Sequence, residues 1–266
     1  MSSRSFRWTC LYLNGTTIWR LALTSGETVL TEHNRFFEHI ADYFVPIHRD
    51  GQKFVAASLV ATVILLLVWA PLGWLAAIFT AWIAYIFRDP DRVVPTRDGL
   101  LVAPSDGSVE YIEEVLPDTE LDLGPEHRVR ISIHLSLFDG HITRTPVAGT
   151  IVRMLYIPGL FASVHSPKSS EDNERRAYII EMASGDRIAV VQIAGGIRRR
   201  IVAFQEEGAR MGIGERIGLI RFGSRVDLYL PAGFSALVAV GQSMIGGETV
   251  VGDLKSDEKE RSARVV

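Results

Sequence analysis

Hydrophobic positions divide the chain into one long apolar run and a later region of short alternating runs. Residues 54–87 contain no charged side chain and hold three of the five tryptophans. From about residue 95 to 252, apolar and polar positions alternate in short runs separated by Gly and Pro. A period of two is typical of strands that bury one face. The pattern therefore predicts a hydrophobic helical segment followed by a mostly β domain.

The apolar run is too long for one upright membrane helix. A continuous helix over residues 54–87 would be about 50 Å long, against roughly 30 Å of hydrocarbon. Pro71 and Gly73 interrupt the run, so we expect two helices, 54–70 and 72–87, that form a hairpin dipping into the bilayer. A buried core hairpin is the alternative. The basic flanks favour the cytoplasmic side of a membrane for both ends; they are His48, Arg49, Lys53, Arg88 and Arg92.

The later region predicts a compact β domain, mostly β with some helix (α+β). Alternation is clearest at residues 128–135, 187–193 and 225–230. A faint internal repeat relates residues 103–110 (APSDGSVE) to 145–152 (TPVAGTIV), each a Pro-x-x-Gly turn that leads into a β-branched strand. Compact β-hammerhead or barrel-sandwich modules are built from such turns. The repeat is evidence for the architecture of the domain and gives no indication of its catalytic activity.

These patterns divide the chain into four segments. An N-terminal segment, 1–46, has a hairpin signal at Asn14-Gly15 and helical spacing over 32–43. The helical hairpin and its flanks take 47–94, the β domain 95–252, and a charged tail 253–266. The tail has no apolar face to bury, so we expect it to fray.

Composition excludes several classes of protein. The 266 residues carry 28 basic and 31 acidic side chains, and this near-neutral balance gives no general reason to bind nucleic acid. The single cysteine, Cys10, cannot form an internal disulfide, which excludes a disulfide-stapled scaffold. With 47% hydrophobic residues, the chain can form a core and is not intrinsically disordered.

Five short blocks of the chain carry candidate chemistry. Gly223-Ser224 separates two alternating apolar stretches, Asp106 lies in a Pro-Ser-Asp-Gly turn, and His141 lies in residues 138–144 (FDGHITR). Asn173-Glu-Arg follows a Ser-rich loop, and Gly195-Gly196 precedes three arginines. In this order, together with residues 87–92 (FRDPDR), the blocks resemble those of short-form phosphatidylserine decarboxylases over about residues 47–251.

The resemblance implies a proenzyme that cuts itself between residues 223 and 224. Ser224 would become a covalent pyruvoyl group, and chains 1–223 and 224–266 would stay associated as a heterodimer. The pyruvoyl group would form a Schiff base with phosphatidylserine and release CO2 to give phosphatidylethanolamine. The expected location is the cell membrane, with the catalytic domain at the cytoplasmic face of the lipid bilayer. Gly223 has no Cβ, so its carbonyl is open to attack by the serine hydroxyl.

The resemblance also assigns residue roles. His141 is expected to transfer protons, and Asp106 to orient or activate the cleavage site. Long-form relatives carry a second histidine three positions after the first, where this chain has Arg144. His165 is a further candidate, for proton transfer or substrate binding. Arginines suited to the lipid phosphate or carboxylate are Arg175, Arg198 and Arg199.

Each candidate residue also has a structural interpretation. Gly-Ser between strands and Asp before Gly are common in turns. His141 and His134 suit a strand or a core, and the arginines after Gly196 suit a solvated strand edge.

Two other functions use the same residues. His134, Asp139, His141 and His165 would suffice for a zinc site in a membrane-anchored hydrolase, although their spacing matches no zinc motif. A membrane-anchored biotinyl or lipoyl module would need a lysine at a hairpin tip, which both Pro-x-x-Gly turns lack.

Overall fold

The computed structural model describes residues 7–13, 16–22, 46–159, 173–195, 201–221 and 224–256, with single positions 258, 261 and 263. The chain falls into two units, Met1–Val45 and Pro46–Val266. In the first unit, β1 (Arg7–Leu13) pairs antiparallel with β2 (Thr16–Ala22), and Leu13 lies opposite Thr16. This confirms the hairpin predicted around Asn14-Gly15. The helix predicted over 32–43 lies outside the described residues.

Two antiparallel helices begin the second unit. Helix α2 spans Arg49–Val68 and α3 spans Ala70–Ile86, with Trp69 in an extended conformation between them. Pro71 lies in the first turn of α3, where its missing N–H costs no hydrogen bond. The break therefore falls slightly before the predicted position. Gly73 lets the helices approach closely, because a Cβ there would lie 2.5 Å from Leu66.

The two ends of the helical hairpin meet at its base. Ile47 and Arg88 form a β-bridge, and the His48 N–H donates to the Phe87 carbonyl at 2.9 Å. Nearer the middle of the helices, the hydroxyls of Thr62 and Thr80 lie 2.9 Å apart. Both flanks therefore leave the hairpin at the same end, as predicted.

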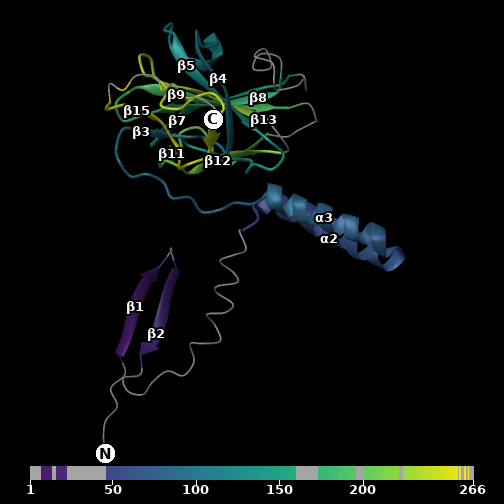
Figure 1. Cartoon of the computed structure of the whole chain (residues 1–266). Coiled ribbons are helices and arrows are strands. Elements are labelled where there is room, and N and C mark those ends of the chain that lie inside the picture. The colour runs from purple at the N-terminus through teal and green to yellow at the C-terminus, as the bar shows by residue number, and fades with distance from the viewer. Residues whose placement is uncertain are drawn as a thin grey trace, which may run out of the picture. The chain divides into compact units, whose positions relative to one another are not determined.

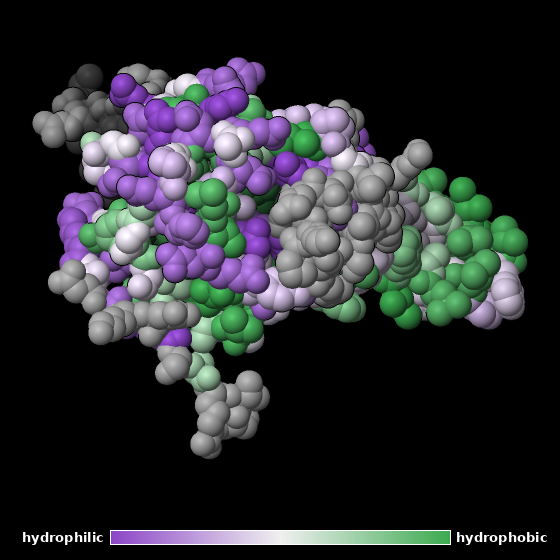
Figure 2. All heavy atoms as spheres, turned by 90° about the horizontal axis from the view of Figure 1, so that it is seen from above, coloured by the Kyte–Doolittle hydropathy of each residue, from purple (hydrophilic) through white to green (hydrophobic). Residues whose placement is uncertain are grey.

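Most of the hairpin surface is apolar and exposed. Helix α2 is long and apolar enough to cross a membrane, whereas α3 is a shorter apolar helix. Only Gly51 and Thr62 of α2 are buried, while Leu67 is 83% exposed. Figure 2 shows the hairpin as a hydrophobic lobe beside a mostly hydrophilic domain. This exposure contradicts the buried-core alternative and is consistent with membrane association.

The β domain is built on a curled sheet of eight antiparallel strands (Figure 1), in the order β11-β7-β8-β9-β13-β5-β4-β14. Smaller sheets, β10-β12-β6 and β15-β3, complete it. This confirms the mostly β fold with a preceding helical hairpin. The strands are β3 (Leu100–Val102), β4 (Gly107–Val115), β5 (Arg128–Leu135), β6 (Ile142–Arg144), β7 (Gly149–Ile157), β8 (Arg175–Glu181), β9 (Arg187–Ala194), β10 (Ile201–Ala203), β11 (Arg210–Met211), β12 (Arg216–Ile220), β13 (Ser224–Tyr229), β14 (Ser243–Met244) and β15 (Val250–Asp253), and a 3-10 turn, η1, spans Thr119–Leu121.

The predicted internal repeat is a structural repeat. Gly107 and Gly149 are the first residues of β4 and β7, and each strand carries an irregularity shortly after its start. Each also pairs with a two-residue edge strand, β14 or β11. A Cβ on either glycine would lie within 2.5 Å of a carbonyl oxygen on the neighbouring strand. Glycine is therefore required at both positions for close strand packing.

The main core lies inside the curled sheet, and a smaller cluster attaches the helical hairpin. Ile131, Ile133 and Val226 belong to the main core and are fully buried. At the hairpin base, Ile86 and Phe87 pack with residues of β6 and β12. The described part of the tail also contacts the domain, since the Leu254 N–H donates to the Gly99 carbonyl at 2.7 Å.

Candidate active site

The backbone of Ser224 is held between two strands. Ser224 is the first residue of β13, and it pairs with Leu135 of β5 on one side and with Ala194 of β9 on the other. Gly223 lies outside the described residues. The serine therefore stands where the chain enters the middle of the large sheet.

Asp106 lies near the same end of the sheet, immediately before β4. Ser108 of β4 pairs with His134 of β5, and the next residue of β5, Leu135, is the partner of Ser224. Adjacent strands lie about 4.8 Å apart. The start of β4 is therefore about two strand spacings, roughly 10 Å, from the backbone of Ser224.

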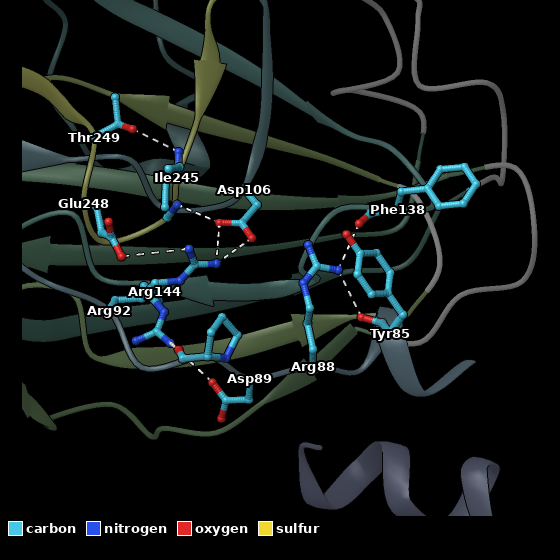
Figure 3. A network of polar contacts seen from close by, with 12 residues as sticks. Tyr85, Arg88, Asp89, Arg92, Asp106, Phe138, Arg144, Ile245, Glu248 and Thr249 are labelled. Carbon is cyan, nitrogen blue, oxygen red and sulfur yellow. Dashed lines mark hydrogen bonds and ion pairs between the residues drawn. The ribbon is translucent and has the colours of Figure 1, made fainter. Parts of the chain in front are cut away.

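The Asp106 carboxylate has three close neighbours, Arg92, Gly246 and Gly140, of which Figure 3 labels Arg92. Arg92 Nη2 donates to both carboxylate oxygens, at 2.8 and 2.6 Å, and the Gly246 N–H donates to Oδ1 at 2.8 Å. Glu248 lies on the far side of the guanidinium, 4.0 Å from Arg92 Nη1. A Cβ on Gly140 would lie 2.6 Å from Asp106 Oδ2, so the residue before His141 packs directly against this carboxylate.

His141 is fully buried and follows Gly140, the glycine that packs against Asp106. Its carbonyl accepts a hydrogen bond of 3.1 Å from the N–H of Ile220, the last residue of β12. The turn before it is closed by Asp139, whose carboxylate accepts from the Ser136 N–H at 2.8 Å. Asp139 thus has a local structural role, and the backbone of His141 lies beside the end of β12, the strand that precedes Ser224.

Arg144 anchors the linker that follows the helical hairpin. Its Nη2 donates to the Pro90 carbonyl at 3.0 Å and to Asp89 at 3.3 Å, and its Nη1 donates to the Gly214 carbonyl at 3.0 Å. Burial lowers the pKa of Arg144, and the positive charge of Arg216 lowers it further, but the group remains a cation. The position of the second histidine in long-form relatives is therefore occupied by a structural cation.

Sequence reasoning missed a buried ion pair beside Ser224. Arg225 Nε donates to Asp227 Oδ1 at 2.8 Å and Nη2 to Oδ2 at 3.0 Å, and the two side chains are 0% and 1% exposed. Residues two apart on a strand point to the same face of the sheet, so the sequence Arg225-Val-Asp227 could have predicted this contact. Removing one partner of such a pair typically costs about 3–5 kcal/mol.

Arg175, a predicted substrate-binding residue, is not assembled with this group. Arg175 lies on β8, with Nη2 3.6 Å from Asp118 and 3.9 Å from Glu120, beside the 3-10 turn. The other predicted residues, which lie outside the described part of the chain, are His165, Arg198 and Arg199.

A zinc site gains no support from the described residues. Within them, no group of three or more His, Cys, Asp or Glu side chains is arranged to hold a metal ion. His134 belongs to β5 and pairs with Arg225, whereas Asp139 closes the turn before His141. The fourth proposed ligand, His165, lies outside the described residues.

The assembled groups suit acid–base and nucleophilic chemistry. A carboxylate fixed by a guanidinium, a buried histidine and the backbone of a serine converge at one end of the sheet. A histidine and a carboxylate close to a serine can activate its hydroxyl and can return protons to a reacting centre. This end of the sheet also joins the base of the apolar hairpin through Arg88, which donates to the Phe138 carbonyl at 2.9 Å.

Comparison with known proteins identifies one family. The family model for phosphatidylserine decarboxylase matches residues 79–252. A phosphatidylserine decarboxylase proenzyme of Cereibacter sphaeroides is 49% identical over 223 residues, covering 84% of this chain and 96% of that relative. The proenzyme of Paramagnetospirillum magneticum is 49% identical over 240 residues, covering 90% and 99% respectively.

A third relative gives the same result. The phosphatidylserine decarboxylase proenzyme of Ruegeria pomeroyi is 49% identical over 213 residues, covering 80% of this chain and 97% of that relative. All three matches span nearly the whole relative, so the likeness extends well beyond the short motifs. The chain therefore belongs to the phosphatidylserine decarboxylase family.

Proposed function

We propose that this chain is a membrane-associated proenzyme that cuts itself before Ser224 and then converts phosphatidylserine to phosphatidylethanolamine and CO2. The observation that carries the proposal is the convergence of Asp106, His141 and the start of β13 beside the base of an apolar hairpin. Family membership supports this function over the zinc hydrolase and the biotinyl or lipoyl module.

Self-cleavage would use the groups around the start of β13. The hydroxyl of Ser224 would attack the carbonyl carbon of Gly223, and an N-to-O acyl shift would convert the peptide bond to an ester. Elimination of this ester would release chain 1–223 with a carboxylate end and leave dehydroalanine at residue 224, which tautomerises and loses ammonia by hydrolysis to give the ketone. A base must take the hydroxyl proton, and His141 is the proposed base because its segment is hydrogen-bonded to the strand leading to the cut. Asp106, kept in place by Arg92, would orient this segment through its contact with Gly140.

The site fits a pyruvoyl group derived from Ser224. Because Ser224 pairs with Leu135 and Ala194, a group formed at this position would stay fixed after the chain is cut. A pyruvoyl group would supply a ketone that condenses with an amine and accepts the electron pair left behind when a carboxylate is lost as CO2. The role of His141 in turnover would then be to deliver a proton to the substrate carbon that has lost CO2.

The helical hairpin would hold the enzyme at its substrate. Its apolar helices insert into the bilayer, and the basic residues Lys53 and Arg88 at its base suit the cytoplasmic surface, where anionic lipid is met. A substrate that stays in the bilayer is thereby presented at a high effective concentration. The partners proposed for this chain are accordingly phosphatidylserine and a lipid bilayer.

The decisive experiment is intact-mass analysis of wild type and Ser224→Ala. Wild type should give two chains, 1–223 and 224–266, the second beginning with a ketone-bearing blocked terminus. Ser224→Ala should remain one chain and form no phosphatidylethanolamine in vesicles. A fully processed Ser224→Ala protein would overturn the cleavage assignment. Full wild-type activity from an uncut chain would overturn the pyruvoyl mechanism.

A further inference from the structure

A cavity lies between the base of the helical hairpin and the large sheet. Its volume is about 570 Å³, and strand β10 forms one wall. The charged residues that line it come from α2, from β8 and the segment before it, and from the end of β12; they are Asp50, Lys53, Glu174, Arg176 and Arg221. The cavity thus joins the part of the hairpin nearest the domain to the strands around Ser224.

The two arginines in this cavity are held by aromatic rings. The Arg176 guanidinium carbon lies 5.3 Å from the ring centre of Tyr156, its register partner on β7, and that of Arg221 lies 5.2 Å from the ring centre of Phe54 on α2. Within the described part of the chain, neither forms an ion pair with a carboxylate, and each has a buried Nε without a hydrogen-bond partner. Such guanidinium groups are suited to bind an anion.

Strand alternation explains why Arg176, and not Arg175, faces the cavity. Successive side chains of a strand point to opposite faces. Arg175 points toward Asp118 and Glu120, whereas Arg176 lines the cavity. Of these two neighbouring cations, Arg176 is therefore the one placed to meet a ligand near the active site.

The cavity is continuous with the segments that hold the candidate catalytic residues. Arg221 follows Ile220, whose N–H donates to the His141 carbonyl at 3.1 Å. On the opposite wall, the Glu174 carbonyl accepts from the N–H of Ala194 at 2.9 Å, and Ala194 is the register partner of Ser224. A ligand in the cavity would therefore lie between the bilayer-facing hairpin and the reacting group.

We propose that this cavity binds the headgroup of phosphatidylserine, with Arg176 and Arg221 on its phosphodiester and Lys53 at the bilayer surface. The inference rests on the proposed function and deepens it. Guanidinium forks match phosphate oxygens, and a lysine near a helix end extends its ammonium to the lipid surface. The mixture of three cations and two carboxylates matches a headgroup that carries two anionic groups and one ammonium.

The first test is a kinetic comparison of mature full-length enzymes in mixed micelles of phosphatidylserine. Arg176→Gln should raise the apparent KM about tenfold, leave kcat within about twofold, and process fully on a denaturing gel. Arg176→Lys should give a smaller rise, because it keeps the charge but loses the fork. Arg153→Gln, an exposed arginine on β7, is the matched control and should match wild type.

The second test measures binding without turnover. Calorimetric titration of the uncut Ser224→Ala protein with glycerophosphoserine, which has the headgroup but no acyl chains, should give an affinity that falls about tenfold when Arg176→Gln is added. Without Ser224, no ketone is formed that could react with the serine amine. Inorganic phosphate should bind more weakly than glycerophosphoserine. Equal binding of the two would overturn the headgroup assignment in favour of a simple anion site.

The two tests separate failure of the site from failure of the function. If wild type decarboxylates phosphatidylserine but Arg176→Gln keeps its KM and its affinity for glycerophosphoserine, the proposed site is wrong. If wild type forms no phosphatidylethanolamine, the proposed function fails, and the titration still decides whether the cavity binds this headgroup.

Discussion

Arg92 lies in the linker that follows the helical hairpin and forms an ion pair with Asp106 of the candidate active site. Its guanidinium contacts both oxygens of Asp106, and the two side chains are only 14% and 13% exposed. An ion pair shielded from water in this way is screened less than a surface pair. Arg92 is therefore a positioning residue, which fixes the carboxylate against the glycine that precedes His141.

Arg92→Gln should slow self-cleavage about tenfold, because Asp106 would lose its charged partner and its fixed orientation. The measurement is the rate at which the uncut chain disappears after synthesis, followed on a denaturing gel. Arg97→Gln is the control, because it removes a linker arginine that is 59% exposed and that pairs with Asp253 and not with Asp106. Cleavage of Arg92→Gln at the wild-type rate would contradict this role.

Individual site residues were only partly predictable from the sequence. Asp106 and His141 stood out through the blocks that carry them, and the structure brings their segments together. The partner of Asp106 is fourteen positions earlier in the chain and comes from the linker after a helix, a contact that no local pattern encodes. Arg176 was passed over for its neighbour Arg175, because only the folded sheet decides which face meets the cavity.

Among the elements, the helical hairpin is the part with the most exposed apolar surface. Its helices hold to each other through close packing at Gly73 and the Thr62–Thr80 contact, and such interhelical hydrogen bonds contribute about 0.6 kcal/mol on average in membrane proteins. The outer faces, including Leu67 near the tip, are apolar and exposed, and we propose that they contact lipid. Membrane binding and the chemistry of the β domain should therefore be separable.

Leu67→Arg should weaken binding to lipid vesicles while leaving self-cleavage in detergent intact. An arginine at the centre of an inserted helix costs about 2.5–3.5 kcal/mol. Because the tip is the part of a dipping hairpin that would reach deepest into the bilayer, Leu67→Arg should reduce partitioning by up to about a hundredfold. Vesicle flotation measures the bound fraction. Leu116→Arg, at an exposed leucine after β4, serves as the control. Unchanged flotation of Leu67→Arg would show that this part of the hairpin does not enter the bilayer.

The individual strands and turns were the features of this structure that the sequence predicted best. The alternating runs predicted β5, β9 and β13 to within one residue, because the period of two follows directly from burial of one sheet face. The repeated Pro-x-x-Gly turn correctly marked the starts of β4 and β7. The order of the strands in the sheet could not be predicted from the sequence, because β13 pairs with β5 and β9, which are distant from it along the chain.

At the scale of the whole molecule, the proposed cut separates strands that are neighbours in one sheet. Residues 224–266 supply β13 to the middle of the large sheet, β14 to its edge and β15 to the pair with β3. Val226, Leu228 and Val251 of this segment are fully buried. Each such side chain contributes about 1.5–3 kcal/mol when buried. The small chain is therefore part of the core and not an appendage.

The two mature chains should remain together in native buffer. Size-exclusion chromatography in detergent should show one peak that contains both chains, and denaturant should separate them. Loss of the small chain from the peak in native buffer would contradict the placement of β13 between β5 and β9. The uncut Ser224→Ala protein provides the reference elution volume for the intact fold.

The central position of β13 also sets the molecularity of folding. Before the cut, β13 finds its place between β5 and β9 by a unimolecular search within one chain, whereas after the cut the same step needs an encounter between two molecules. Refolding of denatured mature enzyme then depends on protein concentration, and at low concentration mass action favours the separated chains. The proposed cut therefore requires folding to come first, so that β13 already lies between β5 and β9 when the chain is divided.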